Sequence, residues 1–390
     1  MVSIRDAVHI CSILSYIVEK KNMEMTIKEK MGRINTFIRG KGFTYDCGMI
    51  ENFWLSLKSK PFVILAGISG TGKTRLVKLF SDAIGAEFRM VPVRPDWTDS
   101  SALLGRSTPN GDFIPGQVLR IIVEAKDDPE KPYILLLDEM NLARVEYYLS
   151  EFLSVMETRD FKDGKIVTDR LMPFEYYGDV RFPENLYLVG TVNMDETTFP
   201  FSKKVLDRAN TIEFNTVHLM PSDSGYDPDA APIAEDNSFL KSKYLFLSQS
   251  LNEENRDFIE SICADLEEIN QALKLNNAHV GYRVRDEIVF YLLNNRDAGL
   301  LSRDEAMDNA IMQKILPRIQ GSSVFVREML WELFRIFAGD AAEIQTGNSV
   351  TGSEMLANLK GKKVKYPKSA EKAAFMVRRL EEDGTTSFWL

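Results

Sequence analysis

The chain has 390 residues, which is more than one small hydrophobic core usually organises, so two or three domains are expected. Its 44% hydrophobic and 27% charged residues are typical of a soluble globular protein, and without a run of about eighteen apolar residues no membrane-spanning helix is expected. The net charge of −9 argues against a broadly basic nucleic-acid-binding surface. The three cysteines and three histidines are scattered and show no zinc-ligand spacing. The cysteines also form no disulfide framework, and this favours the reducing cytoplasm as the location of the protein.

Residues 1–58 are expected to form a helical N-terminal extension. The apolar stretch Ala7–Val18 has some features of a signal peptide, but polar residues interrupt it and no small-residue cleavage site follows, which favours an amphipathic helix. Apolar residues at helical spacing predict another helix over Met31–Ile38, and a further short helix is expected over Met49–Leu57.

Residues 59–216 have a pattern typical of an α/β domain. Three continuous apolar runs of strand length are present, at Phe62–Ala66, Tyr133–Leu137 and Leu186–Val192. Helical patterns such as Val118–Ala125 alternate with these runs, and this alternation predicts a parallel sheet that helices cover on both faces. The expected fold class is therefore α/β, with a parallel sheet between helices.

An all-helical domain is expected to follow this core. Residues 217–240 are rich in acidic residues and proline, which predicts a linker or an extended loop. Apolar periodicity then predicts a helical lid over residues 241–340, with helices at Phe258–Leu273, Val284–Leu293, Asp304–Ile315 and Val324–Phe337. Residues 341–390 are expected to form a C-terminal tail.

The tail contains the one basic run of the chain. Its members are Lys360, Lys362, Lys363, Lys365 and Lys368. Such a run can contact DNA, but no aromatic ladder interleaves it, and this favours a solvated and partly mobile segment.

A glycine-rich loop follows the first apolar run. Residues 67–74 read Gly-Ile-Ser-Gly-Thr-Gly-Lys-Thr and match the phosphate-binding pattern G-x-x-x-x-G-K-[ST] at every position. Backbone amides and the start of the next helix would wrap the phosphates, Lys73 would neutralise the β- and γ-phosphates, and Thr74 would place its hydroxyl on Mg²⁺. A turn without a ligand is the alternative. The expected nucleotide-binding residues are Gly67, Ser69, Gly70, Thr71, Gly72, Lys73 and Thr74.

Polar side chains follow the two other apolar runs. Asp138 and Glu139 come after the second run, and Asn193 comes after the third. Because ligands of open α/β sheets bind at the carboxyl ends of the strands, these residues are expected to lie near the phosphate loop. Asp138 is expected to hold Mg²⁺ directly or through water, Glu139 to polarise the attacking water and Asn193 to orient it. The alternative for Asp138 and Glu139 is that they only cap the strand end, and the alternative for Asn193 is a turn residue without a role at the site.

With these strand ends, the chain resembles AAA+ proteins of the McrB and MoxR branch, most closely McrB-like motor subunits. The resemblance runs from about Asn52 to Ile319. Besides the phosphate loop, it is carried by Leu103–Gly105, Pro115–Leu119, Leu137–Asn141, Leu149–Glu157 and Gly190–Asn193.

The resemblance implies a ring, usually hexameric, in which each nucleotide lies between two subunits. By position, Arg208 would be the arginine finger, with Arg144 next in line, and Arg283 or Arg285 would be the sensor-2 residue of the lid. A guanidinium suits these roles because it bridges phosphate oxygens through two hydrogen bonds, and supplying it from a neighbour makes hydrolysis depend on assembly. The alternative for each arginine is a surface ion pair.

The sequence departs from McrB-like GTPases in two places. The sensor-1 stretch Val192–Asp195 is one residue shorter than their Met-Asn-x-x-Asp, and Asp207–Ala209 stands where they carry a double arginine. Both departures favour ATP over GTP as the nucleotide that binds with Mg²⁺.

Three functions are considered on this basis. The first is the motor subunit of a restriction or phage-defence complex, which drives a separate McrC-like nuclease on DNA. The second is a MoxR-like chaperone that remodels protein complexes. The third is a module that uses nucleotide only to hold a ring together, and the intact Glu139 and Arg208 argue against it.

Overall fold

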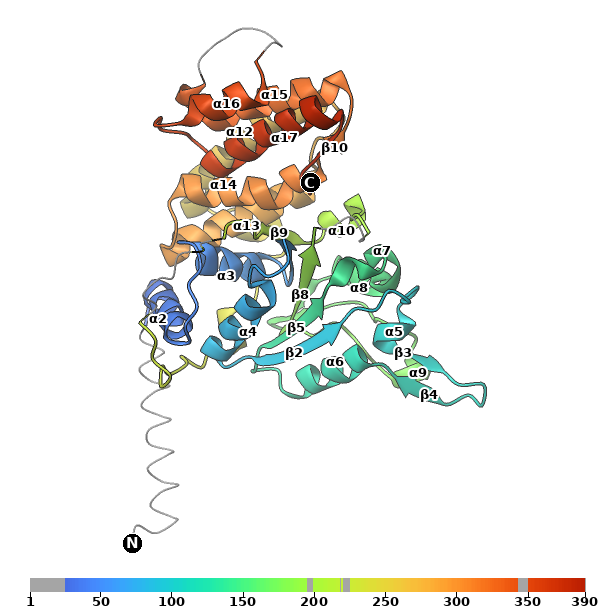
Figure 1. Cartoon of the computed structure of the whole chain (residues 1–390). Coiled ribbons are helices and arrows are strands. Elements are labelled where there is room, and N and C mark those ends of the chain that lie inside the picture. Colours follow the sequence, from blue (N-terminus) through green and yellow to red (C-terminus); the bar gives the residue numbers. More distant parts are fainter. Residues whose placement is uncertain (1–24, 195–198, 218, 220–224, 343–349, 390) are drawn as a thin grey trace.

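The computed structural model describes residues 25–194, 199–217, 219, 225–342 and 350–389. An α/β core carries a parallel sheet, and a helical region formed by the C-terminal part of the chain is stacked on this core (Figure 1). The predicted fold class is therefore confirmed. No helix in the described ranges has both the length and the apolar character needed to cross a membrane. The helix expected at Ala7–Val18 lies outside the described residues.

Five parallel strands form the central sheet in the order β2-β5-β8-β1-β9. Their bounds are Phe62–Gly67 for β1, Glu87–Pro92 for β2, Tyr133–Asp138 for β5, Leu186–Asn193 for β8 and Asn210–Glu213 for β9. The inner strands β1, β5 and β8 are the three predicted apolar runs, each one residue longer at its carboxyl end. The edge strands β2 and β9 were not predicted, because β2 carries charged side chains and β9 is only four residues long.

Side chains of the inner strands alternate between two hydrophobic clusters, one on each face of the sheet. Val63 and Leu65 belong to the cluster that includes α2, α3, α4 and most of the helical region, whereas Phe62 and Ile64 belong to the cluster around α6, α7 and α8. The bounds of these helices are Ile27–Gly40 for α2, Met49–Ser59 for α3, Lys73–Ile84 for α4, Gln117–Asp127 for α6, Val145–Tyr148 for α7 and Ser150–Val155 for α8.

Short helices, 3₁₀ turns and hairpins connect the longer elements. The helices are Ser101–Leu104 (α5), Phe174–Tyr177 (α9), Lys203–Leu206 (α10) and Leu247–Ser250 (α11), and the single 3₁₀ turns are Met140–Leu142, Asn237–Phe239, Leu316–Arg318 and Gly339–Ala341. Two antiparallel hairpins are formed by β3 (Gly105–Ser107) with β4 (Phe113–Pro115), and by β6 (Asp160–Lys162) with β7 (Lys165–Val167).

The described part of the N-terminal extension packs into the core. Its helix α2 begins before the predicted Met31 because the Thr26 hydroxyl accepts a hydrogen bond from the Glu29 amide, while the Glu29 carboxylate accepts one from the Thr26 amide. In α3, the ring of Phe53 packs edge-on against that of Phe80 in α4, with centroids 5.1 Å apart. Residues 25–59 thus share the hydrophobic core of the α/β domain.

The described end of the expected linker, residues 225–240, lies against α2 and α4. The amides of Ile233 and Glu235 each donate a hydrogen bond of 2.8 Å to the last turn of α4. Lys30 of α2 forms an ion pair of 2.6 Å with Glu235. This stretch is therefore an extended loop fixed to the core.

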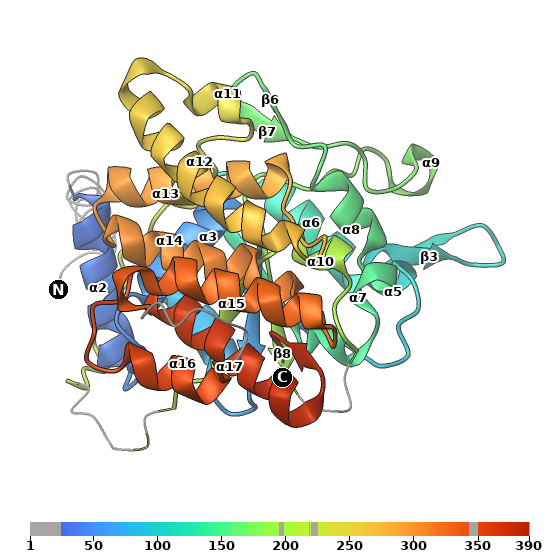
Figure 2. The same ribbon diagram turned by 90° about the horizontal axis from the view of Figure 1, so that it is seen from above.

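Among its described residues, the helical region has six main helices. Their bounds are Glu253–Lys274 for α12, Tyr282–Ala298 for α13, Arg303–Lys314 for α14, Val324–Ala338 for α15, Gly352–Leu359 for α16 and Pro367–Asp383 for α17. Figure 2 looks down on this region, where α15, α16 and α17 lie side by side. A Cβ at Gly352 would lie 2.4 Å from the Arg378 backbone nitrogen, so α16 approaches α17 too closely for a side chain at that point.

The C-terminal residues 350–389 differ from the expected tail, because α16 and α17 belong to the helical region. The final strand β11 (Thr386–Ser387) pairs with β10 (Gln320–Gly321). In the lysine run, Lys365 forms an ion pair of 3.1 Å with Asp265, and Lys368 donates a 2.8 Å hydrogen bond to Asn309. Both lysines thus have partners in the helical region, and Lys368 is also exposed to solvent, in agreement with a solvated segment.

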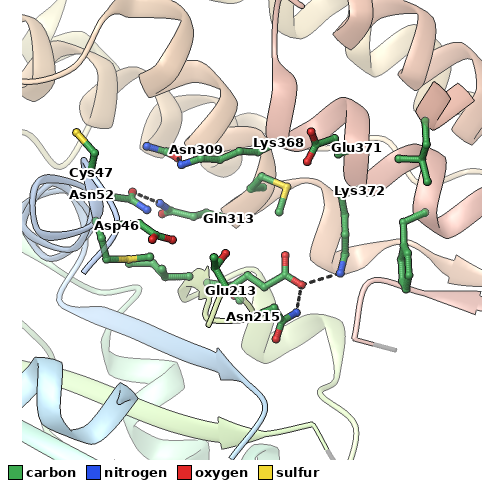
Figure 3. Close-up of a pocket in the computed structure, with 17 residues that line it drawn as sticks. Asp46, Cys47, Asn52, Glu213, Asn215, Asn309, Gln313, Lys368, Glu371 and Lys372 are labelled. Atoms are coloured by element: carbon green, nitrogen blue, oxygen red, sulfur yellow. Dashed lines mark hydrogen bonds and ion pairs between the residues drawn. The ribbon is translucent and has the colours of Figure 1, made fainter. Parts of the chain in front are cut away.

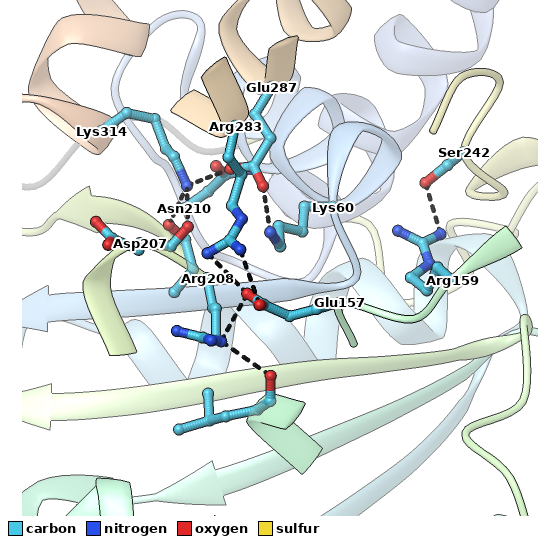
Figure 4. Close-up of polar contacts among 12 residues, drawn as sticks. Lys60, Glu157, Arg159, Asp207, Arg208, Asn210, Ser242, Arg283, Glu287 and Lys314 are labelled. Atoms are coloured by element: carbon cyan, nitrogen blue, oxygen red, sulfur yellow. Dashed lines mark hydrogen bonds and ion pairs between the residues drawn. The ribbon is translucent and has the colours of Figure 1, made fainter. Parts of the chain in front are cut away.

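A buried charge cluster joins the core to the helical region (Figure 4). The Glu287 carboxylate on α13 forms ion pairs with Lys60, just before β1, and with Lys314 at the end of α14, the latter at 2.5 Å. All three side chains are at most 9% exposed, and we call them the buried triad. Burial raises the pKa of Glu287, but the two lysine charges outweigh burial and hold that pKa below its ordinary value of 4.5.

Replacement of Glu287 by Gln is expected to lower the free energy of unfolding by about 3–5 kcal/mol, because two buried ammonium groups lose their counter-charge. The pKa of Glu287 is lower in the folded protein than its unfolded value of 4.5. The ion pairs of Glu287 therefore contribute to stability above pH 4.5, and this contribution is lost as the pH falls through the folded pKa. Urea denaturation of both proteins at neutral and acidic pH measures this difference. Asp96→Asn, which breaks an exposed pair with Arg94, is the control and should cost at most about 1 kcal/mol. Equal losses in the two variants would contradict the assignment.

Candidate nucleotide-binding site

The phosphate loop connects β1 to α4 and depends on three glycines. A Cβ at Gly67 would lie 2.1 Å from the carbonyl oxygen of Phe214, so the adjacent chain after β9 leaves no room for a side chain. Gly70 and Gly72 have φ angles of +83° and +91°, which disfavour residues with a Cβ. Gly72 is the N-cap of α4, so the first free amides of this helix face the loop.

Lys73 is the first residue of α4 and is only 5% exposed. Its ammonium group donates hydrogen bonds to the carbonyl oxygens of Gly67, at 2.9 Å, and Ile68, at 2.7 Å. Burial lowers the pKa of Lys73, and the charges of Asp138 and Glu139 oppose this effect. The loop therefore holds a partly desolvated cation, which favours a strong interaction with a phosphate anion.

The Asp138 carboxylate connects three elements at the carboxyl edge of the sheet. Its Oδ1 atom accepts hydrogen bonds from the hydroxyl of Thr74 on α4, at 2.9 Å, and from that of Thr191 on β8, at 2.7 Å. The Thr191 hydroxyl in turn accepts a hydrogen bond of 2.9 Å from the Glu139 amide. Thr191 was not predicted as a site residue, although its hydroxyl near the end of a buried apolar strand was a usable signal.

Glu139 and Asn193 lie beside this carboxylate. The Asn193 side-chain amide donates a hydrogen bond of 2.9 Å to Glu139 Oε1. Glu139 has a φ of +52°, a conformation that is uncommon for a residue with a side chain and that recurs at functional sites. The structure thus brings together the two residues that were predicted to position water.

These residues line one cavity of about 330 Å³. Its walls are formed by Ser69, Gly70, Gly72, Lys73, Thr74, Arg75, Asp138, Glu139, Thr191 and Asn193. Lys73 and Arg75 contribute cationic groups to this lining, and Asp138 and Glu139 contribute carboxylates. This arrangement is suited to a polyphosphate bound together with a metal ion.

The oxygen atoms at this cavity fit Mg²⁺. The hydroxyl of Thr74 and the carboxylate of Asp138 are hydrogen-bonded to each other and both face the cavity. In the part of the chain that the structure describes, no cluster of three or more histidine, cysteine or acidic side chains could hold a metal. Mg²⁺ suits the Thr74 and Asp138 oxygens because proteins usually bind this ion through one or two ligands together with water and substrate phosphates.

The predicted arginines do not line this cavity. Arg208 and Arg283 form ion pairs with the same carboxylate, that of Glu157, at 2.8 and 2.7 Å (Figure 4). Arg285 pairs with the neighbouring Asp286 at 2.6 Å. Arg144 lies over two aromatic rings, those of Tyr147 and Phe199. Within one chain, therefore, none of these guanidinium groups is at the phosphate cavity.

A second and larger cavity, of about 510 Å³, lies between the segment before α3, the end of β9 and the helices α14 and α17 (Figure 3). Asp46 and Cys47 line it from the segment before α3, and Glu213 lines it from the end of β9. On the opposite side, Lys372 of α17 forms an ion pair of 2.7 Å with Glu213. The neighbouring Tyr45 hydroxyl donates a 3.3 Å hydrogen bond to the Gly72 carbonyl, so the same segment borders both the loop and this cavity.

Comparison with known proteins agrees with this geometry. Residues 62–209 match the model of an AAA domain of the dynein-related subfamily, and this stretch contains every residue that lines the phosphate cavity. The chain is also 24% identical over 281 residues to the type IV methyl-directed restriction enzyme EcoKMcrB subunit of Escherichia coli (strain K12), which covers 70% of this chain and 56% of that protein. Residues 62–209 are therefore an AAA domain, and the chain is similar to AAA+ proteins of the McrB and MoxR branch.

Two further matches have a lower sequence identity to this chain. The Lon protease of Metamycoplasma arthritidis (strain 158L3-1) is 23% identical over 316 residues, which is 80% of this chain and 31% of that protein. A putative ATPase from Cytophaga hutchinsonii ATCC 33406 superposes with a TM-score of 0.48 at 16% identity, covering 80% of this chain and 90% of that one. The chain thus spans 56% and 31% of the lengths of its two curated relatives.

The helical region matches a second family. Residues 231–386 correspond to a domain of unknown function (DUF8727). This match includes α12 to α17 and therefore the part of the second cavity that Gln313 and Lys372 line. The AAA+ core and the helical domain thus build this cavity together.

Replacement of Thr191 by Val is expected to lower the rate of nucleotide hydrolysis by about 10- to 100-fold, because the Asp138 carboxylate and the Glu139 amide each lose a hydrogen-bond partner. Nucleotide binding should change little, since the phosphate loop is untouched. Steady-state hydrolysis assays measure the effect. Thr36→Val, on the exposed surface of α2, provides a matched control. A Thr191→Val protein with the turnover of the unmodified chain would contradict this role.

Proposed function

We propose that this protein hydrolyses a nucleoside triphosphate at the phosphate cavity. The observation that carries the proposal is the Asp138 carboxylate, which is hydrogen-bonded to Thr74 at the start of α4 and to Thr191 on β8. Lys73 and the loop amides bind the β- and γ-phosphates, and Glu139, held by Asn193, orients the attacking water. Thr74 and Asp138 would hold Mg²⁺, which would neutralise part of the phosphate charge.

The base and ribose are proposed to occupy the second cavity. It borders the phosphate loop through Tyr45 and is large enough for these groups. ATP is the favoured nucleotide and GTP is the alternative, because the sensor-1 stretch of this chain differs from that of McrB-like GTPases.

Hydrolysis is proposed to require a neighbouring copy in a ring, which is expected to be hexameric. Neither of the arginines predicted as fingers, Arg208 and Arg144, lines the phosphate cavity of its own chain, and this supports a finger that comes from another chain. Arg208 is the proposed finger, with Arg144 next in line, and Arg283 is proposed to act beside Arg208 in the sensor-2 role.

The favoured cellular role is that of the motor subunit in a restriction or phage-defence complex, where a separate McrC-like nuclease acts on DNA. The similarity to a methyl-directed restriction enzyme subunit supports this role. The second candidate is a chaperone that acts on protein complexes, and the similarity to a Lon protease favours it. Hydrolysis of ATP and GTP, measured side by side with DNA, an McrC-like nuclease or unfolded protein added, separates the two. Stimulation by DNA with the nuclease is expected, whereas stimulation by protein alone would favour the chaperone.

Replacement of Glu139 by Gln is expected to lower hydrolysis by about 100-fold or more while nucleotide binding persists, because the amide cannot accept a proton from water. Hydrolysis and nucleotide binding of the same preparation measure both parts. Glu260→Gln, at an exposed position on α12, is the control and should retain full activity. Unchanged turnover in Glu139→Gln would remove Glu139 from the mechanism.

A further inference from the structure

A single carboxylate holds two arginines that come from different domains. Glu157, just after α8, forms ion pairs with Arg208 Nε at 2.8 Å and with Arg283 Nη1 at 2.7 Å, and it accepts a hydrogen bond of 2.8 Å from Arg283 Nη2. Arg208 belongs to the α/β core, whereas Arg283 lies in the first turn of α13. Figure 4 shows the two guanidinium groups on the same side chain of Glu157.

The backbone around Arg208 is fixed from the helical region. The ammonium group of Lys314 donates hydrogen bonds to the carbonyl oxygens of Ala209, at 2.8 Å, and Asp207, at 3.4 Å, which flank Arg208 in the chain. Arg208 itself donates to the carbonyl oxygen of Leu153 at 2.9 Å. The Arg208 guanidinium also donates a hydrogen bond of 2.8 Å to the carbonyl oxygen of Lys204. The fold therefore holds the backbone and the side chain of Arg208, and Glu157 links that side chain to Arg283.

Two guanidinium groups this close together repel each other unless an anion lies between them. Glu157 provides that anion, and the three side chains are exposed enough for a ligand to approach them. The side chains of Arg208, Glu157 and Arg283 are 18%, 26% and 44% exposed. Together with the buried triad, Arg208, Arg283 and Glu157 make a group of four cations and two carboxylates. This group has an excess of positive charge.

We infer that Glu157 is a positioning residue that holds Arg208 and Arg283 together as one pair for the triphosphate of an adjacent copy of the chain. The pair would contact the phosphate of the neighbour, because neither arginine lines the phosphate cavity of its own chain. Glu157 itself would not touch the nucleotide. This inference rests on the proposed role of Arg208.

The test mixes two kinds of defective subunit. Arg208→Ala can bind and position nucleotide but donates no finger, and its activity alone is expected to fall by about 10³-fold. Glu139→Gln binds nucleotide and keeps its arginines but does not hydrolyse. When the two are mixed, each Arg208→Ala site beside a Glu139→Gln subunit should become active.

Glu157→Gln is then added to the donor subunit. With the double variant Glu139→Gln/Glu157→Gln as donor, the restored rate is expected to be at least about tenfold lower than with the Glu139→Gln donor. The kcat should fall and the KM should change little. A donor with Glu139→Gln/Glu260→Gln is the matched control and should restore the full rate. The donor with Glu157→Asp, which keeps the charge on a shorter side chain, should restore an intermediate rate.

The outcomes separate the two proposals. If Glu139→Gln subunits restore no activity, Arg208 does not act between chains, and both the finger assignment and this inference fall. If the Glu157→Gln donor restores the full rate, only the inference about Glu157 is overturned. Sedimentation of the mixtures checks assembly, and failure of the Glu157→Gln donor to enter mixed oligomers would assign Glu157 to assembly and also overturn the inference.

Discussion

The Asp138 carboxylate accepts hydrogen bonds from two threonine hydroxyls, one on α4 and one on β8, and these bonds fix the end of β5 between the phosphate loop and the neighbouring strand. Because β5, β8 and β1 are parallel neighbours, their carboxyl ends meet at one edge and need only short side chains to make these contacts. The same edge carries Glu139 and Asn193. The geometry of the candidate site therefore depends on strand order, and the hydrophobic clusters on both faces of the sheet maintain that order.

The two domains are joined by charge as well as by apolar packing. The buried triad links the chain before β1 to α13 and α14, and the ion pair of Lys372 with Glu213 links α17 to the end of β9. Glu157 adds a third connection, between Arg208 of the core and Arg283 of the helical region. Each connection lies close to a functional element, so a change in the position of the helices would alter the second cavity and the arginine pair together.

The sequence predicted the parts of this structure that depend on local pattern. The inner strands are continuous apolar runs, and the phosphate loop is a contiguous motif. The edge strand β2 was missed because charged residues such as Glu87 and Arg89 interrupt its apolar pattern. The packing of α16 and α17 was missed because lysines dominate residues 360–368, between the two helices and at the start of α17. Two of these lysines, however, contact Asp265 and Asn309 far away in the chain. The partner that Arg208 and Arg283 share could not be predicted, since it depends on contacts between residues that are distant in sequence.

Binding of Mg²⁺–nucleotide to the purified chain tests the central claim most directly. Titration of the unmodified protein, Lys73→Ala and Lys78→Ala with Mg²⁺–ATP and Mg²⁺–GTP can be followed by calorimetry, where Lys78 is an exposed lysine on the same helix. The account predicts binding by the unmodified protein and by Lys78→Ala, and loss of binding in Lys73→Ala, because Lys73 supplies the buried ammonium group of the phosphate loop. Failure of the unmodified chain to bind either nucleotide at millimolar concentration, or undiminished binding by Lys73→Ala, would contradict it.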